Sequence, residues 1–234
     1  MTRDEQKRSA AEAALEYVEP GSTIGVGTGS TAAFFIESLA ALPAALRPGA
    51  AVPSSDATAA ALRRAGVPVV GLEDALPLPL YVDGADEVDP ELRLLKGGGG
   101  AHAREKVLAS AAALFVCIVD EAKLVERLGD GPAGAPGSGA PLPLAVLPMA
   151  AAFVAERVRA LGGSPAARRG YLTDDGAAVL DVRGLDLSDP EWLEAALEAV
   201  PGVVACGLFA FRRADVLLAG TDSGVARPTC RGTP

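Results

Sequence analysis

Short apolar segments alternate with helical patterns through the first 120 residues, and this alternation constrains the fold more than any other feature. Strand-like segments lie at residues 23–26, 50–53, 67–70, 80–82 and 113–119. Strands that are separated by helices run parallel, because each helix returns the chain to the edge where the previous strand began. Apolar strands of this kind are typical of sheets that are covered on both faces. The pattern therefore predicts an α/β fold with a mostly parallel sheet.

The helices between these strands are predicted from apolar periodicity and from their boundary residues. An amphipathic pattern over 3–18 stops before Pro20-Gly21, and a second helix is expected over 30–41. A third helix follows the polar cluster Ser54-Ser55-Asp56 and runs to Arg64. Ser and Asp are favoured at helix N-termini because their side chains accept hydrogen bonds from free N–H groups.

The second half of the chain has a different order of elements. The expected strands and helices, in chain order, are strand 142–147, helix 149–161, strands 167–172 and 177–182, helix 189–199 and strand 202–208. The turn Asp174-Asp175-Gly176 joins two apolar runs, which is a hairpin signal. The order βαββαβ is that of the ferredoxin-like split motif. A last strand at 215–218 is expected to return to the first sheet.

These patterns divide the chain into two domains. Residues 1–128 and 207–225 are expected to form a Rossmann-like domain that carries the candidate site residues described below. Residues 142–206 are expected to form a smaller, ferredoxin-like α+β domain. The segment 129–141 is rich in Gly and Pro, which disfavours regular structure, and it is predicted to be a flexible linker. Residues 226–234 are predicted to be a disordered tail.

Composition excludes several classes of protein. The 234 residues include 21 Lys and Arg against 30 Asp and Glu, a net charge of −9, so a basic surface for nucleic acid is not expected. Three Cys without close spacing and a single His exclude zinc sites that need several such ligands. No uncharged apolar run approaches the roughly 18 residues of a membrane span, and the N-terminal residues lack a signal-peptide pattern. We therefore expect a cytoplasmic protein.

The segment Gly-Val-Gly-Thr-Gly-Ser-Thr at residues 25–31 lies between a strand and a helix. Glycines let the backbone approach a ligand closely, and a helix N-terminus presents free N–H groups to an anion. Thr28, Ser30 and Thr31 add hydroxyl donors, so the segment favours a phosphate group over a plain glycine-rich turn. It is not a dinucleotide fingerprint, because Ser30 occupies the third glycine position, and it lacks the Gly-Lys-Ser/Thr of a Walker A loop.

Two carboxylates mark the segment Tyr-Val-Asp-Gly-Ala-Asp-Glu at residues 81–87. Asp83 ends an apolar strand, where open α/β sheets bind their ligands, and Asp86 follows across Gly84. Such a pair can bind hydroxyls, transfer protons or hold a divalent metal. For an isolated Asp-x-x-Asp, helix capping and solvation would be the commoner role.

Four consecutive glycines, residues 97–100, follow Lys96. Such a run contributes nothing to a core and is best explained by a backbone that passes close to a ligand. Lys96 supplies a cation suited to a phosphate or a developing oxyanion. Glu105 lies on the following helix, and its alternative role is that of an ordinary surface Glu beside Arg104 and Lys106.

Three further residues are of types that often have catalytic, metal-binding or core roles. His102, the only histidine, is expected to be partly exposed and to have no direct catalytic role. Cys117 lies in an apolar strand and is expected to be buried as a small hydrophobe. Trp192 is expected to lie in the core of the second domain.

Taken in order, these segments closely resemble ribose-5-phosphate isomerase of type A, a family of the pentose phosphate pathway. The motifs that carry the resemblance are the segments 25–31 and 81–87, Lys-Gly-Gly-Gly (96–99), Arg-Glu-Lys (104–106), Asp-Glu-Ala-Lys (120–123), Pro-Leu-Pro (141–143), Leu-Gly-Gly (161–163), Pro-Gly-Val-Val (201–204) and Gly-Leu-Phe (207–209). Each motif alone is of low specificity, but their order and approximate spacing fit over residues 1–225.

The resemblance implies a sugar-phosphate site that needs neither a metal nor an organic cofactor. The residues that it places at the phosphate are Thr28, Gly29, Ser30 and Thr31, with Lys7 from the first helix. The residues that it places along the sugar are Asp83, Gly84, Ala85, Asp86, Lys96, Gly97, Gly98 and Gly99, with Lys123 as a further substrate contact. It also implies a homodimer or homotetramer that binds neither nucleic acid nor membrane.

The implied reaction interconverts ribose 5-phosphate and ribulose 5-phosphate by moving a proton between C2 and C1 through an enediolate. Glu105 would be the base that serves both carbons, and Lys96 with the loop N–H groups would stabilise the negative oxygen. Asp83 is the candidate for the proton transfer that opens the sugar ring, and Asp86 for orienting the hydroxyls.

This chain departs from the family pattern in two respects. A fourth glycine, Gly100, and His102 stand where other small or apolar residues are expected, and the segment 129–141 is longer than usual. Two other functions are consistent with parts of the sequence. A nicotinamide-dependent dehydrogenase would explain the first glycine loop but not the other motifs, and a non-catalytic sugar-phosphate sensor would need a partner module that the sequence does not show.

Overall fold

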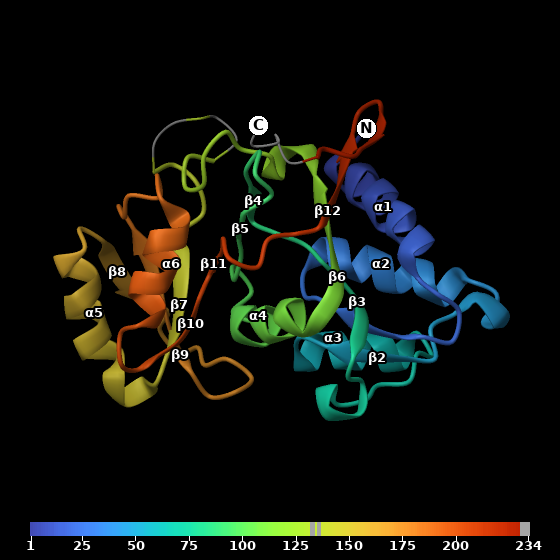
Figure 1. Ribbon diagram of the computed structural model, residues 1–234, viewed down its shortest axis with the longest axis horizontal. Coiled ribbons are helices and arrows are strands. Elements are labelled where there is room, and N and C mark those ends of the chain that lie inside the picture. Colours follow the sequence, from blue (N-terminus) through green and yellow to red (C-terminus); the bar gives the residue numbers. More distant parts are fainter. Residues whose placement is uncertain (132–133, 135–136, 230–234) are drawn as a thin grey trace. The chain divides into compact units, whose positions relative to one another are not determined.

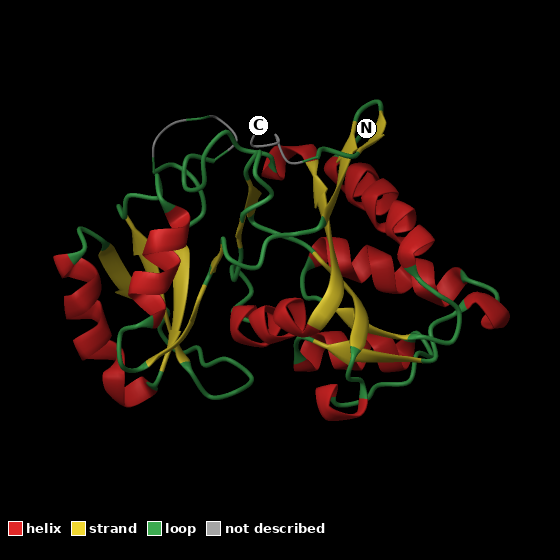
Figure 2. Ribbon diagram, viewed as in Figure 1, coloured by secondary structure: helices red, strands yellow, loops and turns green. Residues whose placement is uncertain are grey.

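A computed structural model describes residues 1–131, 134 and 137–229 (Figure 1). The chain forms two compact units. The first comprises Met1–Ala85, Val107–Ala122 and the residues from Ala214 onward, and the second comprises Asp86–Lys106 and Lys123–Arg213. The helices and strands of each unit are distinguished in Figure 2.

The first unit contains a six-stranded sheet in the order β13-β12-β6-β3-β1-β2. Its strands are β1 Thr23–Val26, β2 Ala50–Pro53, β3 Leu78–Asp83, β6 Ala112–Asp120, β12 Val216–Thr221 and β13 Gly224–Ala226. All neighbours pair in parallel except β12 and β13. The mostly parallel sheet that the sequence predicts is therefore confirmed.

Two helices of this unit, α1 Arg3–Ala13 and α3 Asp56–Arg64, begin at polar residues that cap them. The unit also contains α2 Ser30–Ala41 and a part of α4 His102–Ala111. Thr2 and Glu5 form a capping box at α1, in which each side chain accepts a hydrogen bond from the other residue's backbone N–H. Ser55 caps α3 by accepting a hydrogen bond from the N–H of Thr58. These caps explain why α1 and α3 start where the sequence predicts. The α-helix α1 ends earlier than the predicted segment 3–18, at Ala13, and a 3₁₀ turn over Ala14–Tyr17 follows it.

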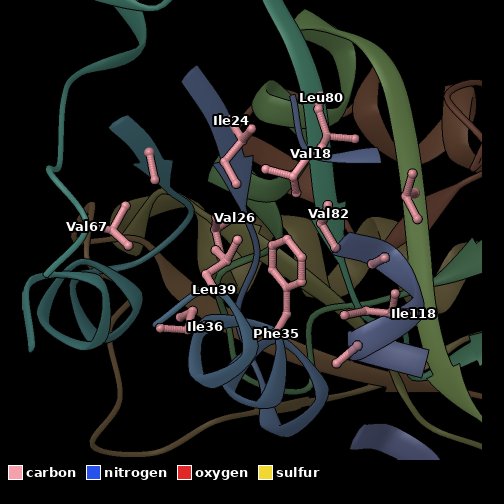
Figure 3. Close-up of a cluster of buried hydrophobic side chains, with 14 of the residues drawn as sticks. Val18, Ile24, Val26, Phe35, Ile36, Leu39, Val67, Leu80, Val82 and Ile118 are labelled. Carbon is pink, nitrogen blue, oxygen red and sulfur yellow. The ribbon is translucent and has the colours of Figure 1, made fainter. Parts of the chain in front are cut away.

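One face of the sheet packs on α1 and α2 through a continuous apolar core. Figure 3 shows Ile24, Val26, Leu80 and Val82 of β1 and β3 beside Phe35 of α2. All five side chains are buried. Helix α1 approaches β12 closely at Gly220, where a Cβ would lie 1.8 Å from the carbonyl oxygen of Gln6. The position of α1 on the sheet therefore depends on a residue without a side chain.

The second unit contains a four-stranded antiparallel sheet in the order β10-β7-β9-β8. Its strands and helices are β7 Leu142–Val146, α5 Ala151–Ala160, β8 Ser164–Ala167, β9 Ala178–Arg183, α6 Pro190–Glu198 and β10 Val203–Cys206. The order of elements, βαββαβ, is the ferredoxin-like order that the sequence predicts. A three-stranded sheet in the order β11-β5-β4 also belongs to this unit and consists of β4 Glu87–Val88, β5 Leu94–Leu95 and β11 Leu208–Phe209.

Three predictions of strands differ from the structure. Residues 67–70 form only an isolated bridge between Val69 and Ala51, and no strand is assigned to them. The strand expected over 167–172 lies earlier, at Ser164–Ala167, and Gly170 has a positive φ of 69°, so the chain turns there. The strand expected over 202–208 is divided at Gly207, because β10 and β11 belong to different sheets. Strand β13 was not expected.

The boundaries of the two compact units differ from those of the predicted domains. Residues 86–106 and 207–213 were expected in the first domain but belong to the second unit. Leu95 of β5 and Leu208 of β11 are buried in the same apolar cluster as Leu144 of β7. Trp192 was expected in a core but is 58% exposed. It lies in the first turn of α6, whose buried face is formed by residues such as Leu193 and Leu197.

Both ends of the predicted linker 129–141 are held by one carboxylate. Glu87 accepts hydrogen bonds from the N–H groups of Gly129 and Ala140, at 2.5 and 2.8 Å. Residues 132–133 and 135–136 of this segment lie outside the described residues, as do 230–234 of the predicted tail. The tail prediction is wrong for its first residues, because Ala226 ends β13 and Arg227 forms an ion pair with Glu16. None of the helices in the described part of the chain has the length and apolar character of a membrane span.

We expect Gly220→Ala to destabilise the first unit. The added methyl group would overlap the backbone of Gln6, so α1 must shift or the sheet must distort, which costs about 1–3 kcal/mol. Urea unfolding monitored by circular dichroism measures this difference. Ser223→Ala, in the exposed turn after β12, is the control and should leave the unfolding midpoint unchanged. An unchanged midpoint for Gly220→Ala would contradict the close seating of α1.

Candidate active site

The strand order of the first unit reverses between β1 and β3. The connection after β1 runs through α2 to β2 on one side, whereas the chain after β3 leads to β6 on the other side. In open α/β sheets, ligands bind beyond the carboxyl ends of the strands at such a reversal. The loop after β1 holds Thr28, and β3 ends at Asp83, so the sheet topology brings two of the predicted site segments together.

The carboxylate of Asp83 joins the ends of these two strands. Its Oδ1 atom accepts hydrogen bonds from the N–H groups of Thr28 and Gly84, at 3.0 and 2.7 Å, and Oδ2 accepts one from the hydroxyl of Tyr81. Asp83 and Tyr81 are both fully buried. Gly27 leaves the space that this carboxylate fills, since a Cβ there would lie 1.8 Å from Asp83. The loop after β1 is therefore fixed to the end of β3 through one side chain.

The hydroxyl of Thr28 belongs to a buried cluster of hydroxyl groups. Its Oγ1 atom lies 2.7 Å from Oγ of Ser54, 2.8 Å from Oγ of Ser55 and 3.1 Å from Oγ1 of Thr58. Thr58 also donates a hydrogen bond to the carbonyl oxygen of Gly27 at 2.9 Å. This cluster connects the loop to the start of α3. The side chain of Thr28 thus holds the loop in place, a role that its sequence motif does not predict.

The start of α2 retains the features of an anion site. Its N-cap residue is Gly29, with a φ of 122°, and no side chain caps the first turn. The N–H groups of a first helical turn have no partner within the helix, and the helix dipole favours a negative charge beside them. Ser30 is exposed and Thr31 is buried, both in this first turn.

In the second unit, Lys96 and Glu105 form a buried ion pair. The Nζ atom of Lys96 lies 3.2 Å from Oε2 of Glu105, and the two side chains are only 3% and 5% exposed. Nζ of Lys96 also lies 5.5 Å from the centre of the Phe209 ring. Buried charges are retained in proteins when they are paired in this way, so the pair isolates one carboxylate and one ammonium from bulk solvent. The surface role considered for Glu105 is therefore wrong.

The glycines after Lys96 form a turn, and the side chain of Asp86 accepts a hydrogen bond from it. Gly97 and Gly100 have positive φ values of 101° and 78°, and the N–H of Gly100 donates to the carbonyl oxygen of Gly97 at 2.9 Å. Oδ2 of Asp86 accepts a hydrogen bond from the N–H of Gly98 at 2.8 Å. Gly98 and Gly99 are exposed. This unit therefore brings together Asp86, Lys96, the glycines and Glu105.

His102 has a structural role that differs from the expectation. It is fully buried at the start of α4, and its Nε2 atom accepts a hydrogen bond from the N–H of Ala145 in β7 at 3.0 Å. The expectation of partial exposure is wrong, because the histidine connects α4 to the neighbouring sheet of the same unit. The pKa of His102 is lowered from 6.5 to about 4, mainly by burial and also by the positive charges of Lys106, Arg168 and Lys96, while a hydrogen bond with the backbone of Ala205 acts in the opposite direction.

The remaining predicted residues lie on several elements. Lys7 on α1 forms an ion pair with Asp4 at 3.6 Å. Lys123 ends the 3₁₀ turn Glu121–Lys123 after β6. Gly84 and Ala85, directly after β3, are partly exposed. Cys117 is buried in β6, as expected.

Among the described residues, one group has the spacing of metal ligands: Glu194, Glu198 and Cys206. The ammonium of Lys106 already lies within this group, 2.5 Å from Glu194 and 2.6 Å from Glu198. A divalent cation would meet the positive charge of Lys106 there, so the group is better described as a lysine held by two carboxylates. It connects α4 to α6.

Sequence reasoning missed several residues that hold the site residues in place. They are Tyr81, Ser54, Ser55, Thr58, His102, Arg168 and Tyr171. The hydroxyl cluster had one local signal, since Ser54-Ser55-Asp56 was identified as a helix cap. Tyr81 lies two residues from Asp83 in the same motif, although the motif does not indicate that its hydroxyl binds this carboxylate. His102 contacts Ala145, Arg168 contacts Gly98 and Tyr171 contacts Gly99, and these residues are distant in the chain, so no local pattern indicates the contacts.

We expect the pKa of His102 to make the protein less stable in mild acid. The unfolded state takes up a proton near pH 6.5, whereas the native state resists protonation until about pH 4. Stability from this group is therefore complete above pH 6.5 and falls as the pH decreases towards 4, by up to about 1.4 kcal/mol per pH unit. Urea unfolding between these pH values measures the slope. His102→Gln keeps an acceptor for Ala145 but does not titrate, and an equal slope in both proteins would contradict the assignment.

Comparison with known proteins agrees with this geometry. The family model described as ribose 5-phosphate isomerase A (phosphoriboisomerase A) matches residues 50–224. Ribose-5-phosphate isomerase A of Bordetella bronchiseptica is 50% identical over 99% of this chain and 100% of its own length. The corresponding protein of Acidithiobacillus ferrooxidans is 50% identical over 96% of this chain and 98% of its own.

Solved structures give the same result. Ribose 5-phosphate isomerase A from Neisseria gonorrhoeae superimposes with a TM-score of 0.92 at 42% identity, covering 99% of both chains. A D-ribose-5-phosphate isomerase in complex with phospho-erythronic acid has a TM-score of 0.88 at 33% identity, covering 97% of this chain and 99% of its own. The fold, the motifs and the relatives lead to one conclusion: this chain belongs to the ribose 5-phosphate isomerase A family.

Proposed function

We propose that this protein interconverts D-ribose 5-phosphate and D-ribulose 5-phosphate through an enediolate, with Glu105 as the general base. The buried ion pair between Glu105 and Lys96 is the observation that supports this proposal most directly. The reaction belongs to the non-oxidative branch of the pentose phosphate pathway. It requires neither a redox cofactor nor a metal, since one proton moves between two adjacent carbons.

The base in this reaction must be ionised before it accepts a proton from C2. The ammonium of Lys96, 3.2 Å away, favours the charged form of Glu105. After the transfer the substrate oxygens carry negative charge, and the same ammonium is available to stabilise them. Because both side chains are almost fully buried, water competes little with these interactions. We therefore assign the proton transfer to Glu105 and the stabilisation of the enediolate to Lys96.

We assign the phosphate group to the start of α2. The uncapped N–H groups after Gly29 and the hydroxyls of Ser30 and Thr31 are donors suited to a dianion. Lys7 and Lys123 are assigned supporting contacts with the substrate. A net charge of −9 repels a dianionic ligand, so these local donors must create a positive potential at the site.

Asp83 and Asp86 are assigned to the sugar hydroxyls. Asp83 is the candidate for the proton transfer that opens the furanose ring of ribose 5-phosphate. Asp86, which also accepts a hydrogen bond from Gly98, is the candidate for orienting the open-chain hydroxyls beside Gly84, Ala85 and the glycines. The two carboxylates thus act before and during the transfer that Glu105 performs.

Phospho-erythronic acid, the ligand of one related structure, supports this assignment by its chemistry. It carries a phosphate at one end and a planar carboxylate at the other, so its two carboxylate oxygens resemble those of an enediolate. A protein that stabilises an enediolate is expected to bind such a compound more tightly than its substrate. We also propose, from the family resemblance, a homodimer or homotetramer in the cytoplasm.

Glu105→Gln should abolish exchange of the C2 proton with solvent while leaving phospho-erythronic acid bound. The amide keeps the size of the side chain but cannot accept the proton, and removal of a positioned base lowers kcat by about 10²- to 10⁴-fold. Steady-state kinetics, proton exchange followed by NMR and calorimetric titration measure the three quantities. Glu156→Gln, on the exposed surface of α5, is the matched control. Near-normal turnover of Glu105→Gln would remove this residue from the mechanism.

Tyr81→Phe should slow ring opening without affecting the later proton transfer. The change removes one donor from Asp83 but keeps the buried ring, whose centre lies 5.0 Å from that of Phe115. We expect turnover of ribose 5-phosphate to decrease by about 10- to 100-fold, the effect of one hydrogen bond to a charged group.

Ribulose 5-phosphate provides the control for this variant. Its C5 hydroxyl is esterified, so it forms no furanose ring, and enzyme-catalysed exchange of its C1 proton needs no ring opening. Exchange at C1 should therefore be unchanged in Tyr81→Phe. An equal loss in both assays would show that Asp83 acts in the proton transfer itself.

A further inference from the structure

We propose that Tyr171 and Arg168 are positioning residues for the glycine turn 97–100. Both lie in the loop between β8 and β9 of the second unit. The Tyr171 hydroxyl donates a hydrogen bond to the carbonyl oxygen of Gly99 at 2.8 Å, and Nη1 of Arg168 donates one to that of Gly98 at 3.2 Å. The inference rests on the proposed function, because the turn matters for catalysis only if it lies along the substrate.

The two hydrogen bonds determine the direction of the peptide groups in the turn. In a trans peptide the C=O and the following N–H point in opposite directions. When Arg168 binds the carbonyl of Gly98, the N–H of Gly99 is therefore directed away from Arg168. Gly98 and Gly99 are exposed, and glycine has the widest conformational freedom of all residues. The N–H groups of Gly98 and Gly100 are also held by Asp86 and by the carbonyl of Gly97. Without the contact from Arg168, the N–H of Gly99 could point in several directions.

The residues that hold the turn are themselves fixed. Arg168 donates hydrogen bonds to both carboxylate oxygens of Asp181 in β9, at 2.9 and 2.5 Å, and its guanidinium lies 5.2 Å from the centre of the Tyr171 ring. Arg104, the residue before Glu105, forms hydrogen bonds of 2.8 and 2.9 Å with Asp175 of the same loop. The loop therefore contacts both the glycine turn and the first turn of α4.

Gly100 and Tyr171 form a matched pair. A Cβ at residue 100 would lie 2.1 Å from the Tyr171 hydroxyl oxygen, and the φ of 78° is a further obstacle to any other residue. The fourth glycine, which departs from the expected family pattern, thus provides the space that the tyrosine occupies. The position of the Tyr171 hydroxyl therefore gives a physical reason for a glycine at residue 100 in this chain.

The first test is the Tyr171→Phe variant, which removes only the hydroxyl. We expect kcat for ribose 5-phosphate to decrease by about 3- to 10-fold, the effect of one neutral hydrogen bond, with little change in KM. The midpoint of urea unfolding should stay at the wild-type value, since the hydroxyl contacts a turn at the surface. Leu172→Ala, at the exposed neighbouring residue, is the control and should leave kcat unchanged. Unchanged kcat in Tyr171→Phe would overturn the proposal.

The second test measures the coupling between residues 100 and 171. Gly100→Ala should reduce kcat by about 10-fold or more, because the methyl group displaces Tyr171 and disturbs the turn. Tyr171→Val removes the obstructing ring, so the double variant should recover part of the lost kcat despite the strained φ. Independent, multiplicative effects of the two changes would contradict the pairing.

The outcome for the wild-type protein separates this inference from the proposed function. If wild-type protein does not isomerise ribose 5-phosphate, the proposed function is wrong. The glycine turn then has no role in this reaction, and the inference about Tyr171 and Arg168 is wrong as well. If wild-type protein is active and Glu105→Gln is not, while Tyr171→Phe keeps the wild-type kcat and the effects of Gly100→Ala and Tyr171→Val simply multiply in the double variant, only the positioning role of Tyr171 fails.

Discussion

The carboxylate of Asp83 connects the two strand ends where the parallel sheet reverses its order. It accepts hydrogen bonds from Thr28 after β1, from Gly84 after β3 and from Tyr81 within β3. A buried carboxylate needs such donors, since an unpaired charge in the interior costs several kcal/mol. The same contacts fix the loop that leads into α2. The geometry of the proposed phosphate site therefore depends on a residue that we also assign to the sugar.

Glu105 illustrates how neighbouring residues on one helix turn are fixed by different partners. Arg104 binds Asp175, Glu105 binds Lys96 and Lys106 binds Glu194 and Glu198. Three consecutive side chains of a helix point in different directions, so the partners surround the first turn of α4. This arrangement limits the movement of the proposed base. A base that must reach two adjacent carbons benefits from a position set within a fraction of an ångström.

The parts of the fold that the sequence predicts are those with local causes. The boundaries of α2 and α3 follow from a glycine-led helix start and a Ser cap, and β1 and β2 from short apolar runs. The strand expected at 67–70 failed because an apolar run also packs as an irregular segment, and periodicity cannot distinguish the two. The prediction that Trp192 is buried was wrong because residue type alone does not give the orientation of a helix.

The residues of the candidate site also include some that local motifs predict and others that depend on contacts between distant segments. Motifs of adjacent residues indicated Asp83, Asp86, Lys96 and Glu105, and the structure pairs Lys96 with Glu105 at 3.2 Å. The hydroxyl cluster around Thr28 and the contact of His102 with Ala145 join segments 26 to 43 residues apart. Such contacts depend on the tertiary fold. The helix cap Ser54-Ser55-Asp56 was visible in the sequence, but nothing in the sequence indicated that it would contact Thr28.

The close approach of Gly27 to Asp83 has a consequence for how relatives of this chain can diverge. A side chain at residue 27 and a carboxylate at residue 83 would occupy the same space, so residue 27 cannot gain a side chain while residue 83 keeps its carboxylate. A lineage that lost the acid could accept alanine or serine at residue 27, and restoring the acid would then require the glycine first. The order of substitutions at this pair is therefore constrained, and loss of the carboxylate becomes difficult to reverse.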